Sequence, residues 1–182
     1  MPKKTTKTIS HAKQFEALSK VSRSITSNLY LEDILKLIVT VTAEIMNSKI
    51  CSLSLLDEKT NTLILKATQS MSEAYNKKPP LRVGEGIAGK VTLENKPIAI
   101  YDISKEPEYK YKDIARKEGL KSLLSVPLAV KGRVIGVLNS YTSKPHKFLN
   151  EEIDILTTVA NQAAIVIENS ELMVKTKVVQ EE

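Results

Sequence analysis

The stretch GEGIAG at residues 84–89 has the glycine spacing of a nucleotide-binding loop. Together with Val91 it matches the pattern G-x-G-x-x-G-x-V, which nucleotide-binding loops of several protein classes share. A short glycine pattern carries meaning only if the segments on both sides agree with it. We therefore ask first whether Gly84, Gly86 and Gly89 hold a phosphate or serve another purpose.

The flanking segments argue against a phosphate loop. A dinucleotide-binding loop follows a buried strand, but Pro79 and Pro80 leave no room for one here. Pro97 ends the following helix too early for a crossover helix, and Tyr101 stands where a kinase needs its strand lysine. We therefore reject both interpretations. The glycines are expected to turn the chain into a short helix, which either packs closely on the sheet or walls a ligand pocket.

Length and composition are those of one globular domain with additional helices. The chain has 182 residues, of which 42% are hydrophobic and 26% are charged. It contains no apolar run of membrane-spanning length, and its basic N-terminus lacks the apolar core of a secretory signal. Cys51 is the single cysteine, which excludes an intrachain disulfide and favours a cytoplasmic location.

The net charge of +6 is concentrated near the N-terminus. Residues 1–23 hold six basic side chains and one acidic side chain, Glu16, so the rest of the chain is close to neutral. A nucleic-acid-binding surface would need its basic side chains on the folded body. We expect a basic N-terminal arm, no membrane association and no nucleic-acid binding by this segment.

Hydrophobic periodicity predicts a series of helices and hairpins. Polar stretches, DEKTNT and KGR, supply the turns of two hairpins. Pro127, inside a predicted strand, indicates an edge position, a bulge or a break on a ligand side. Since hairpins form antiparallel pairs, we predict a mixed α/β (α+β) domain around an antiparallel sheet. The predicted elements are helices over 10–27 and 31–45, a hairpin over 48–70, a loop over 72–80, a short helix over 90–95, a strand over 97–103, a helix over 111–119, a hairpin over 121–143 and a long helix from its cap, Asn150, onward.

Several segments in this order resemble a GAF domain over roughly residues 20–172. They include LRVGEGIAGKVTLENKPIAIYDI, with its G-x-G-I-x-G-x-V loop, and GLKSLLSVPLAVKGRVIGVLNSYTS, with S-x-L-x-V-P-L followed by G-V-L. The resemblance implies a sheet of about six antiparallel strands, with terminal helices on one face and a loop-and-short-helix cap over a pocket on the other. Residues 1–19 would form the basic arm and the start of a helix, and residues 173–182 a helical exit.

The resemblance also implies a regulatory module of signalling proteins that binds a ligand and dimerises, and usually no enzyme. Cyclic-nucleotide-binding members carry N-K-x-x-x-F-x-x-x-D-E, which is missing here. Cys51 lies in the first strand rather than where bilins attach, and one cysteine cannot form the disulfide of the family's methionine sulfoxide reductases. His11 and His146 are poorly placed for haem, and no side chains have metal-ligand spacing. The ligand therefore stays unknown, without a sign of haem, bilin, metal or nucleotide.

The pocket lining follows from the resemblance. One of two faces of the first strand, Ser52/Ser54 or Cys51/Leu53, would point into the pocket. Mixed polar and apolar groups favour a small neutral or amphipathic ligand. Tyr109 and Tyr111 are expected in the lining, although surface tyrosines in a loop are the alternative. The candidates are Ser52, Ser54, Gly86, Ile87, Ala88, Tyr101, Tyr109, Tyr111, Ile114, Ser125, Pro127, Asn139 and Tyr141.

The last predicted helix carries two apolar stripes. One stripe would cover the sheet, and the other needs the N-terminal helix or a second copy of the chain as its partner. We predict a homodimer, and the candidates for its contact are Ile155, Val159, Gln162, Val166 and Met173. The ending VVQEE resembles the segment that leads into the RNA-binding ANTAR domain of GAF–ANTAR regulators, so an ANTAR-like output domain is expected after it.

The sequence thus predicts a cytoplasmic sensor of a small molecule that signals through a dimer of helices. Two other functions are kept beside it. A structural dimerisation module without a ligand would have bulky side chains in its pocket. An enzyme would need a nucleophile with its base, paired carboxylates or a metal site, none of which the sequence indicates.

Overall fold

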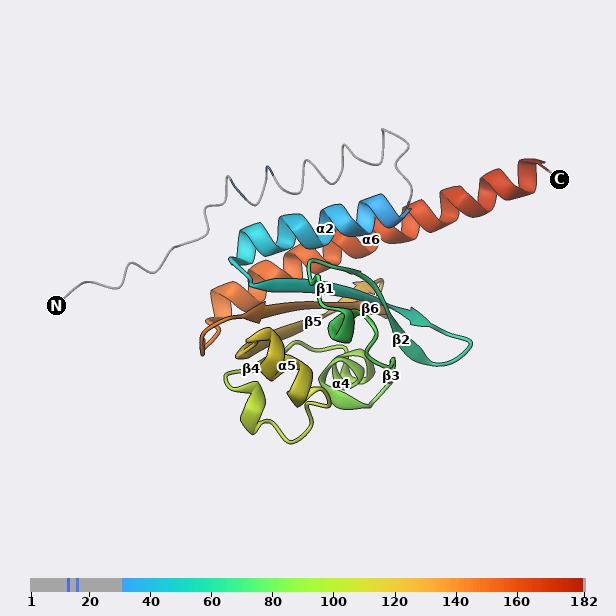
Figure 1. Cartoon of the computed structure of the whole chain (residues 1–182). Helices are drawn as coiled ribbons and strands as arrows, with labels where there is room; N and C mark the ends of the chain where they lie inside the picture. The colour runs from blue at the N-terminus through green and yellow to red at the C-terminus, as the bar shows by residue number, and fades with distance from the viewer. Residues whose placement is uncertain (1–12, 14–15, 17–30, 182) are drawn as a thin grey trace.

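The computed structural model describes residues 13, 16 and 31–181. Except for Lys13 and Glu16, the arm over residues 1–19 and the helix predicted over 10–27 lie outside the described residues. None of the described helices is long and apolar enough to cross a membrane. The described residues form the predicted mixed α/β domain, with one antiparallel sheet between two sets of helices (Figure 1).

The sheet has six strands in the order β3-β2-β1-β6-β5-β4, and all neighbours are antiparallel. Both predicted hairpins are present, and the pairing of β1 with β6 joins them at the centre of the sheet. This confirms the fold that the sequence predicted. The strands are β1 (Ile50–Asp57), β2 (Thr62–Thr68), β3 (Leu81–Arg82), β4 (Ile98–Ile100), β5 (Ser122–Val130) and β6 (Arg133–Thr142).

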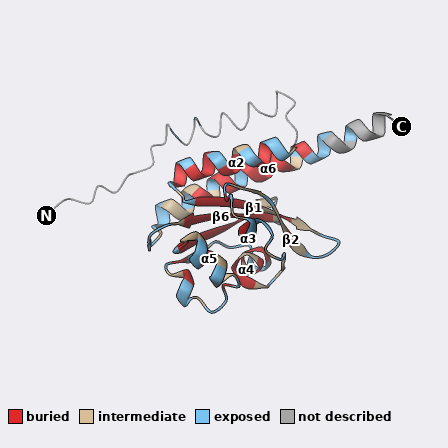
Figure 2. Cartoon of the chain, viewed as in Figure 1, coloured by how far each residue is buried: buried red, intermediate tan, exposed pale blue. Residues whose placement is uncertain are grey.

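Two long helices, α2 (Leu31–Met46) and α6 (Asn150–Glu181), cover one face of the sheet (Figure 1). We call this face the helix face. Figure 2 shows the buried residues of α2 and α6 gathered next to each other and the sheet. Their side chains form one apolar cluster with alternate residues of the central strands, such as Leu53, Leu124 and Leu138. Alternation along a strand sends the intervening residues to the opposite face.

Short elements cover the opposite face, which we call the pocket face. They are α3 (Glu73–Asn76), α4 (Gly86–Glu94), the 3₁₀ turn η1 (Ile103–Lys105) and α5 (Lys112–Glu118). We call these elements and their connecting loops the cap. A second apolar cluster lies between the cap and the sheet and includes Ile50, Ile87, Leu123 and Val137. A cavity lies within this layer.

Two predictions about the cap were wrong in detail. The loop predicted over 72–80 contains the helical turn α3, because the Ser72 hydroxyl accepts a hydrogen bond from the Tyr75 backbone N–H and caps it. The short helix predicted from residue 90 begins earlier, at Gly86. Residues 86–89 of the glycine stretch are therefore the first turn of α4, and Gly84 lies in the turn before it.

Pro127 lies in β5 opposite Val137 of β6. β5 is an inner strand, but β4 pairs only with residues 123–125, so Pro127 lies beyond the end of β4 and its missing N–H breaks no ladder there. A register shift between Leu128 and Ala129 follows it. Of the alternatives left open for this proline, the edge position describes it best.

Candidate functional site: a small cavity between sheet and cap

The glycine stretch brings the start of α4 close to the sheet edge. A Cβ atom on Gly89 would lie 2.3 Å from the carbonyl oxygen of Arg82 in β3, so only glycine permits this approach. Gly86 has a φ of 62°, in the left-handed region that favours glycine. These two constraints place Ile87 and Ala88 in the first turn of α4, facing a cavity on the pocket face.

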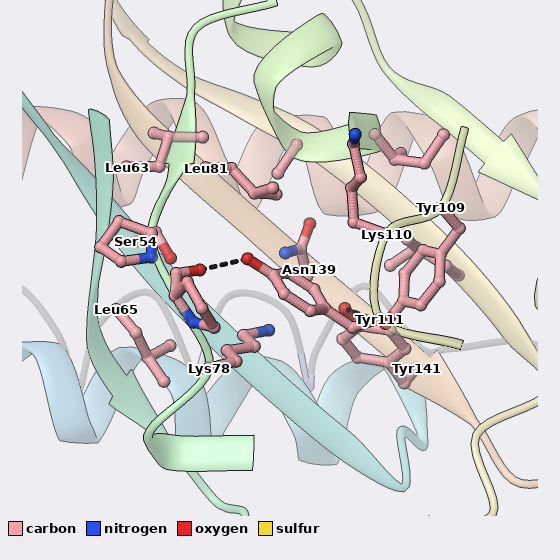
Figure 3. Close-up of a pocket in the computed structure, with 15 residues that line it drawn as sticks. Ser54, Leu63, Leu65, Lys78, Leu81, Tyr109, Lys110, Tyr111, Asn139 and Tyr141 are labelled. Carbon is pink, nitrogen blue, oxygen red and sulfur yellow. Dashed lines mark hydrogen bonds between the residues drawn. The ribbon is translucent and has the colours of Figure 1, made fainter. Parts of the chain in front are cut away.

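The cavity lies between the centre of the sheet and the cap and has a volume of about 50 Å³ (Figure 3). Strands β1, β2, β5 and β6 form its floor, and the segments 78–81, 87–88 and 109–111 form its walls. Its lining residues are Ser54, Leu63, Leu65, Lys78, Pro79, Pro80, Leu81, Ile87, Ala88, Tyr109, Lys110, Tyr111, Leu123, Asn139 and Tyr141. The volume admits a few water molecules or a compact small molecule, since drug-sized pockets measure about 300–1,000 Å³.

Seven of the thirteen predicted pocket residues line this cavity. They are Ser54, Ile87, Ala88, Tyr109, Tyr111, Asn139 and Tyr141. The structure therefore places Tyr109 and Tyr111 at the cavity rather than on an open loop.

The other six predicted residues do not line it. Ser52, Ser125 and Pro127 are buried on the same strands but are not part of the lining, and Gly86 lies one residue before its wall. Ile114 is packed against the apolar cluster of the cap. Tyr101 is 59% exposed, because β4 ends at Ile100 and the chain turns outward. These six predicted positions therefore lie outside the lining of this cavity.

The open choice between the two faces of β1 is settled by the packing. Ser54 lines the cavity, whereas Cys51 and Leu53 belong to the cluster under the helices. Burial raises the pKa of the Cys51 thiol far above its usual range. The thiol is therefore held neutral on the helix face, separated from the cavity by the sheet.

A group of tyrosines closes one end of the cavity. The Tyr109 and Tyr141 hydroxyl oxygens lie 3.3 Å apart and share a hydrogen bond, and the Tyr75 ring meets the Tyr141 ring edge to face at 6.2 Å. The Tyr111 hydroxyl donates to the carbonyl oxygen of Pro79 (Figure 3). Burial raises the pKa of Tyr75, Tyr109 and Tyr141, so these hydroxyls stay neutral and offer hydrogen bonds rather than charge.

Unpartnered polar atoms gather on the pocket face. Among the described residues, three buried side-chain atoms have no hydrogen-bond partner: the Tyr75 hydroxyl, Ser125 Oγ and Asn139 Oδ1. Ser125 and Asn139 are opposite each other in the pairing of β5 with β6. Asn139 alone of these three lines the cavity, where it is 6% exposed. Its amide is thus a buried group that lacks a partner and borders an open space.

Two lysines line the cavity, and the sequence did not predict either of them. Lys110 lies 3.7 Å from the Glu85 carboxylate. Lys78 lies instead among aromatic rings, with its Nζ 4.0 Å from the centre of the Tyr75 ring and 5.3 Å from that of Tyr111. The sequence contains no signal that would separate Lys78 from its neighbour Lys77, since both stand in a stretch predicted as a loop.

Comparison with known proteins agrees with this architecture. The family model described as GAF domain matches residues 29–168. This chain belongs to the GAF domain family.

The curated relatives of this GAF domain are longer proteins. The chain is 27% identical over 155 residues to a phosphoenolpyruvate-dependent phosphotransferase system protein of Escherichia coli, covering 85% of this chain and 21% of that protein. It is 29% identical over 156 residues to a methyl sulfide methyltransferase-associated sensor of Methanosarcina acetivorans, covering 83% of this chain and 16% of that protein. The chain thus spans about a fifth of the length of these relatives. GAF domains of this kind are sensory and regulatory modules of signalling proteins.

Solved structures show the same fold. The GAF domain of a phosphoenolpyruvate-protein phosphotransferase from Coxiella burnetii superposes with a TM-score of 0.77 at 27% identity, covering 90% of this chain and 98% of that one. A free methionine-R-sulfoxide reductase from Neisseria meningitidis, solved with its substrate, has a TM-score of 0.74 at 19% identity, covering 91% and 96%. At this identity the likeness concerns the fold alone. The GAF fold thus includes enzymes beside its many sensory members.

The helix α6 places its predicted dimer residues in two environments. Val159 and Val166 are buried in the cluster that α2, α6 and the sheet share, and Ile155 packs against it. The stripe that lacked a partner in the sequence is therefore covered within the chain at these three positions. Gln162 and Met173 are exposed.

Among residues 31–181, no group of three or more His, Cys, Asp or Glu side chains is arranged to hold a metal ion. His146, the described histidine, lies outside the cavity lining, and its Nε2 is 2.8 Å from Oε1 of Glu152. The same carboxylate accepts the Leu149 backbone N–H at the start of α6, so this histidine belongs to a helix-capping arrangement.

Proposed function

We propose that this GAF domain is a sensory module that binds a small molecule in the cavity between sheet and cap. The observation that supports it is the Asn139 amide, whose Oδ1 is buried, unpartnered and next to the cavity. Leaving such a group without a partner costs about 1–3 kcal/mol. A ligand that reaches the floor of the cavity would supply the missing hydrogen bond and would draw the cap toward the sheet.

A structural module without a ligand is the second candidate. The small volume of the cavity, about 50 Å³, favours it. A ligand that exceeds this volume would require the cap to move outward, because side chains such as Leu63, Leu65 and Leu81 line the cavity on several sides.

Mass spectrometry of small molecules released from the purified chain, followed by a thermal-shift screen, separates the two candidates. A sensory module is expected to release or bind a compound that raises its melting temperature, since a ligand of the folded state stabilises it by mass action. In the variant Asn139→Leu this shift should disappear, while a Lys77→Gln control should keep it. A chain that releases nothing and is stabilised by no metabolite would support the structural module.

We propose a binding role rather than a catalytic one. The single cysteine, Cys51, supports this because its thiol is buried on the opposite side of the sheet from the cavity and has a raised pKa. A Cys51→Ala variant should bind the released compound as the parent does. Turnover of that compound, lost on substitution of a cavity residue, would contradict a pure binding role. An unpaired, buried cysteine also fits the cytoplasmic location that we propose.

We further propose that the signal leaves through α6 in a homodimer. Exposed residues on the outer side of α6 follow the alternating three- and four-residue spacing of a two-helix contact: Gln162, Ile165, Asn169, Leu172 and Thr176. Ile165 and Leu172 are 45% and 55% exposed although both are large and apolar. A second copy of the chain would bury them, with Asn169 setting the register between the helices.

Light scattering after size exclusion tests the dimer. The double variant Ile165→Asp with Leu172→Asp should have the mass of one chain where the parent has twice that mass. The control Leu93→Asp, which changes an exposed leucine of α4, should leave the parent's mass unchanged. A parent that already elutes as a single chain at micromolar concentration would overturn the proposal.

A further inference from the structure

The Lys78 ammonium has no acidic partner among the described residues. Its neighbour Lys77 pairs with Glu73 at 2.5 Å, and the other lysine of the cavity, Lys110, lies 3.7 Å from Glu85. Lys78 instead lies between the rings of Tyr75 and Tyr111. Of the two lysines that line the cavity, Lys78 is therefore the one whose charge has no acidic partner among the described residues.

This position is unfavourable for a free cation. Burial lowers the pKa of Lys78 to about 8, so the ammonium still carries its charge in roughly nine-tenths of the molecules at pH 7. The two rings recover part of the lost hydration through cation–π contacts. A full counter-charge is missing, because the fifteen lining residues include two lysines and neither Asp nor Glu. The cavity as a whole is thus electropositive.

The start of α4 adds to this field. Ile87 and Ala88 of its first turn line the cavity, and no side chain caps this end of the helix. The Glu85 carboxylate is turned back instead, where it accepts the Arg82 backbone N–H at 3.2 Å and lies near Lys110. An uncapped helix start favours negative charge in its vicinity.

The remaining lining describes the body of the ligand. Leu63, Leu65 and Leu123 form the apolar part of the floor. Asn139 provides a polar group on the same floor (Figure 3). An amide presents an acceptor or a donor according to which way it is turned, so Asn139 suits a hydroxyl, an amine or a carbonyl. The volume of about 50 Å³ suits a compact molecule, whereas a nucleotide would require the cap to move outward.

We propose that the cavity of this GAF domain takes a small organic carboxylate, with its carboxylate on the Lys78 ammonium and a second polar group on Asn139. The inference rests on the proposed sensory function and names the chemical class of its ligand. It replaces the neutral or amphipathic ligand that the sequence favoured, because Lys78 was not recognised there as part of the lining. One ammonium without an acidic partner, beside an apolar floor, suits a monoanion with a short apolar body better than the strongly hydrated phosphate dianion.

Matched pairs of probes test the charge directly. Acetate, lactate and 3-methylbutanoate are each titrated against the amide of the same shape, and inorganic phosphate is added as a separate anion, with binding followed in ¹H–¹⁵N spectra. At least one carboxylate should bind in the millimolar range and shift the signals of Ile87, Ala88 and Asn139. The amide of the same shape should bind at least about 10-fold more weakly than that carboxylate, because a charge-assisted hydrogen bond is lost.

Variants at neighbouring lysines identify the counter-charge. Lys78→Gln should weaken binding of the carboxylate about 10-fold or more, and Lys78→Arg should keep a measurable part of it. Lys77→Gln, one residue away and already paired with Glu73, should bind within about 2-fold of the parent. The spectra of each variant report at the same time whether its fold is intact.

The outcomes separate this inference from the function on which it rests. Equal binding of carboxylates and amides, or unchanged affinity in Lys78→Gln, would overturn the carboxylate inference and leave a sensor of neutral molecules. Tighter binding of phosphate than of every carboxylate would overturn it in favour of an inorganic anion. Binding of no probe would also overturn it, and the compounds released from the purified chain would then decide whether the module has a ligand at all.

Discussion

The two faces of the sheet are built from the same strands, but their buried polar side chains differ in whether they have hydrogen-bond partners. On the helix face, the buried Thr42 hydroxyl donates to the Ile38 carbonyl, and the Ser140 hydroxyl shares a hydrogen bond of 2.6 Å with that of Ser48. On the pocket face, Ser125 and Asn139 keep buried oxygen atoms without partners. One face is thus satisfied within the chain and the other is not.

This difference separates stability from function. A satisfied apolar layer such as the helix face lowers the free energy of the folded state and needs nothing further. The unpartnered Asn139 amide and the uncompensated Lys78 ammonium raise the free energy of the folded state. Natural proteins retain such groups mainly at sites that bind something. The pocket face should therefore tolerate, or even gain from, substitutions that the helix face does not.

The largest expected effect concerns packing on the helix face. Leu138→Ala removes a fully buried side chain from the cluster under α2 and α6 and should lower the free energy of unfolding by about 3–4 kcal/mol. Leu123→Ala on the pocket face should cost less, about 2 kcal/mol, because Leu123 already borders a cavity and part of its surface has no packing contact to lose. Urea unfolding of both variants measures the difference. An equal or greater loss at Leu123 would contradict the contrast between the faces.

The next effect concerns how the cap is held to the sheet. In Gly89→Ala the new methyl group would meet the Arg82 carbonyl oxygen, so α4 must shift, at a cost of about 2 kcal/mol. The neighbouring Lys90→Ala, which removes an exposed ion pair with Glu108, should change stability by about 0.5 kcal/mol or less. Hydrogen exchange should show amides of the cap losing protection in Gly89→Ala while those of α2 stay protected. Equal loss in both regions would show that the two faces are not independent.

The sequence predicted the helix face better than the pocket face, for a physical reason. Periodicity reports which residues are buried along one element, so α2 and both hairpins could be placed within a few residues. A cavity depends on which loops meet over the sheet, and periodicity carries no such information. Tyr101 was expected at the cavity because the resemblance to GAF domains implied that its segment lines the pocket, while Lys78 was missed because nothing local distinguishes it from Lys77.

Two adjacent residues of β6 compare the faces most directly. Asn139→Leu replaces a buried, unpartnered amide by an apolar group of similar size and should leave stability unchanged or raise it by about 1 kcal/mol. Ser140→Ala points to the helix face and breaks the hydrogen bond with Ser48, so it should lower stability by about 1 kcal/mol. Thermal unfolding of both variants without ligand gives the two signs. A clear loss in Asn139→Leu would mean that the amide has a stabilising partner in the free protein.

The smallest effect is the pH dependence that Lys78 confers on the free protein. Its pKa is about 8 in the folded state against 10.5 for an unperturbed lysine, so above pH 8 the unfolded chain holds the proton more strongly than the folded chain. Stability should then rise with pH from about pH 8 toward 10, and the destabilisation is fully present below pH 8.

The matched variant Lys78→Met keeps the apolar stem beside Tyr75 and Tyr111 without the charge. It should be more stable than the parent at pH 7 by on the order of 1 kcal/mol, the figure being modest because Lys78 keeps contact with solvent. The difference should shrink as the pH rises above about 8 and vanish only above about pH 10.5, where the lysine of the unfolded chain has also lost its proton. The tyrosines of the pocket face, whose pKa values burial raises, lower stability above pH 10 equally in both proteins, so the difference isolates Lys78. Lys77→Met should follow the parent at every pH. If the stability difference between Lys78→Met and the parent does not shrink as the pH rises, the effect of residue 78 lies in packing rather than in charge. The contrast between the two faces would then no longer include an uncompensated charge on the pocket face.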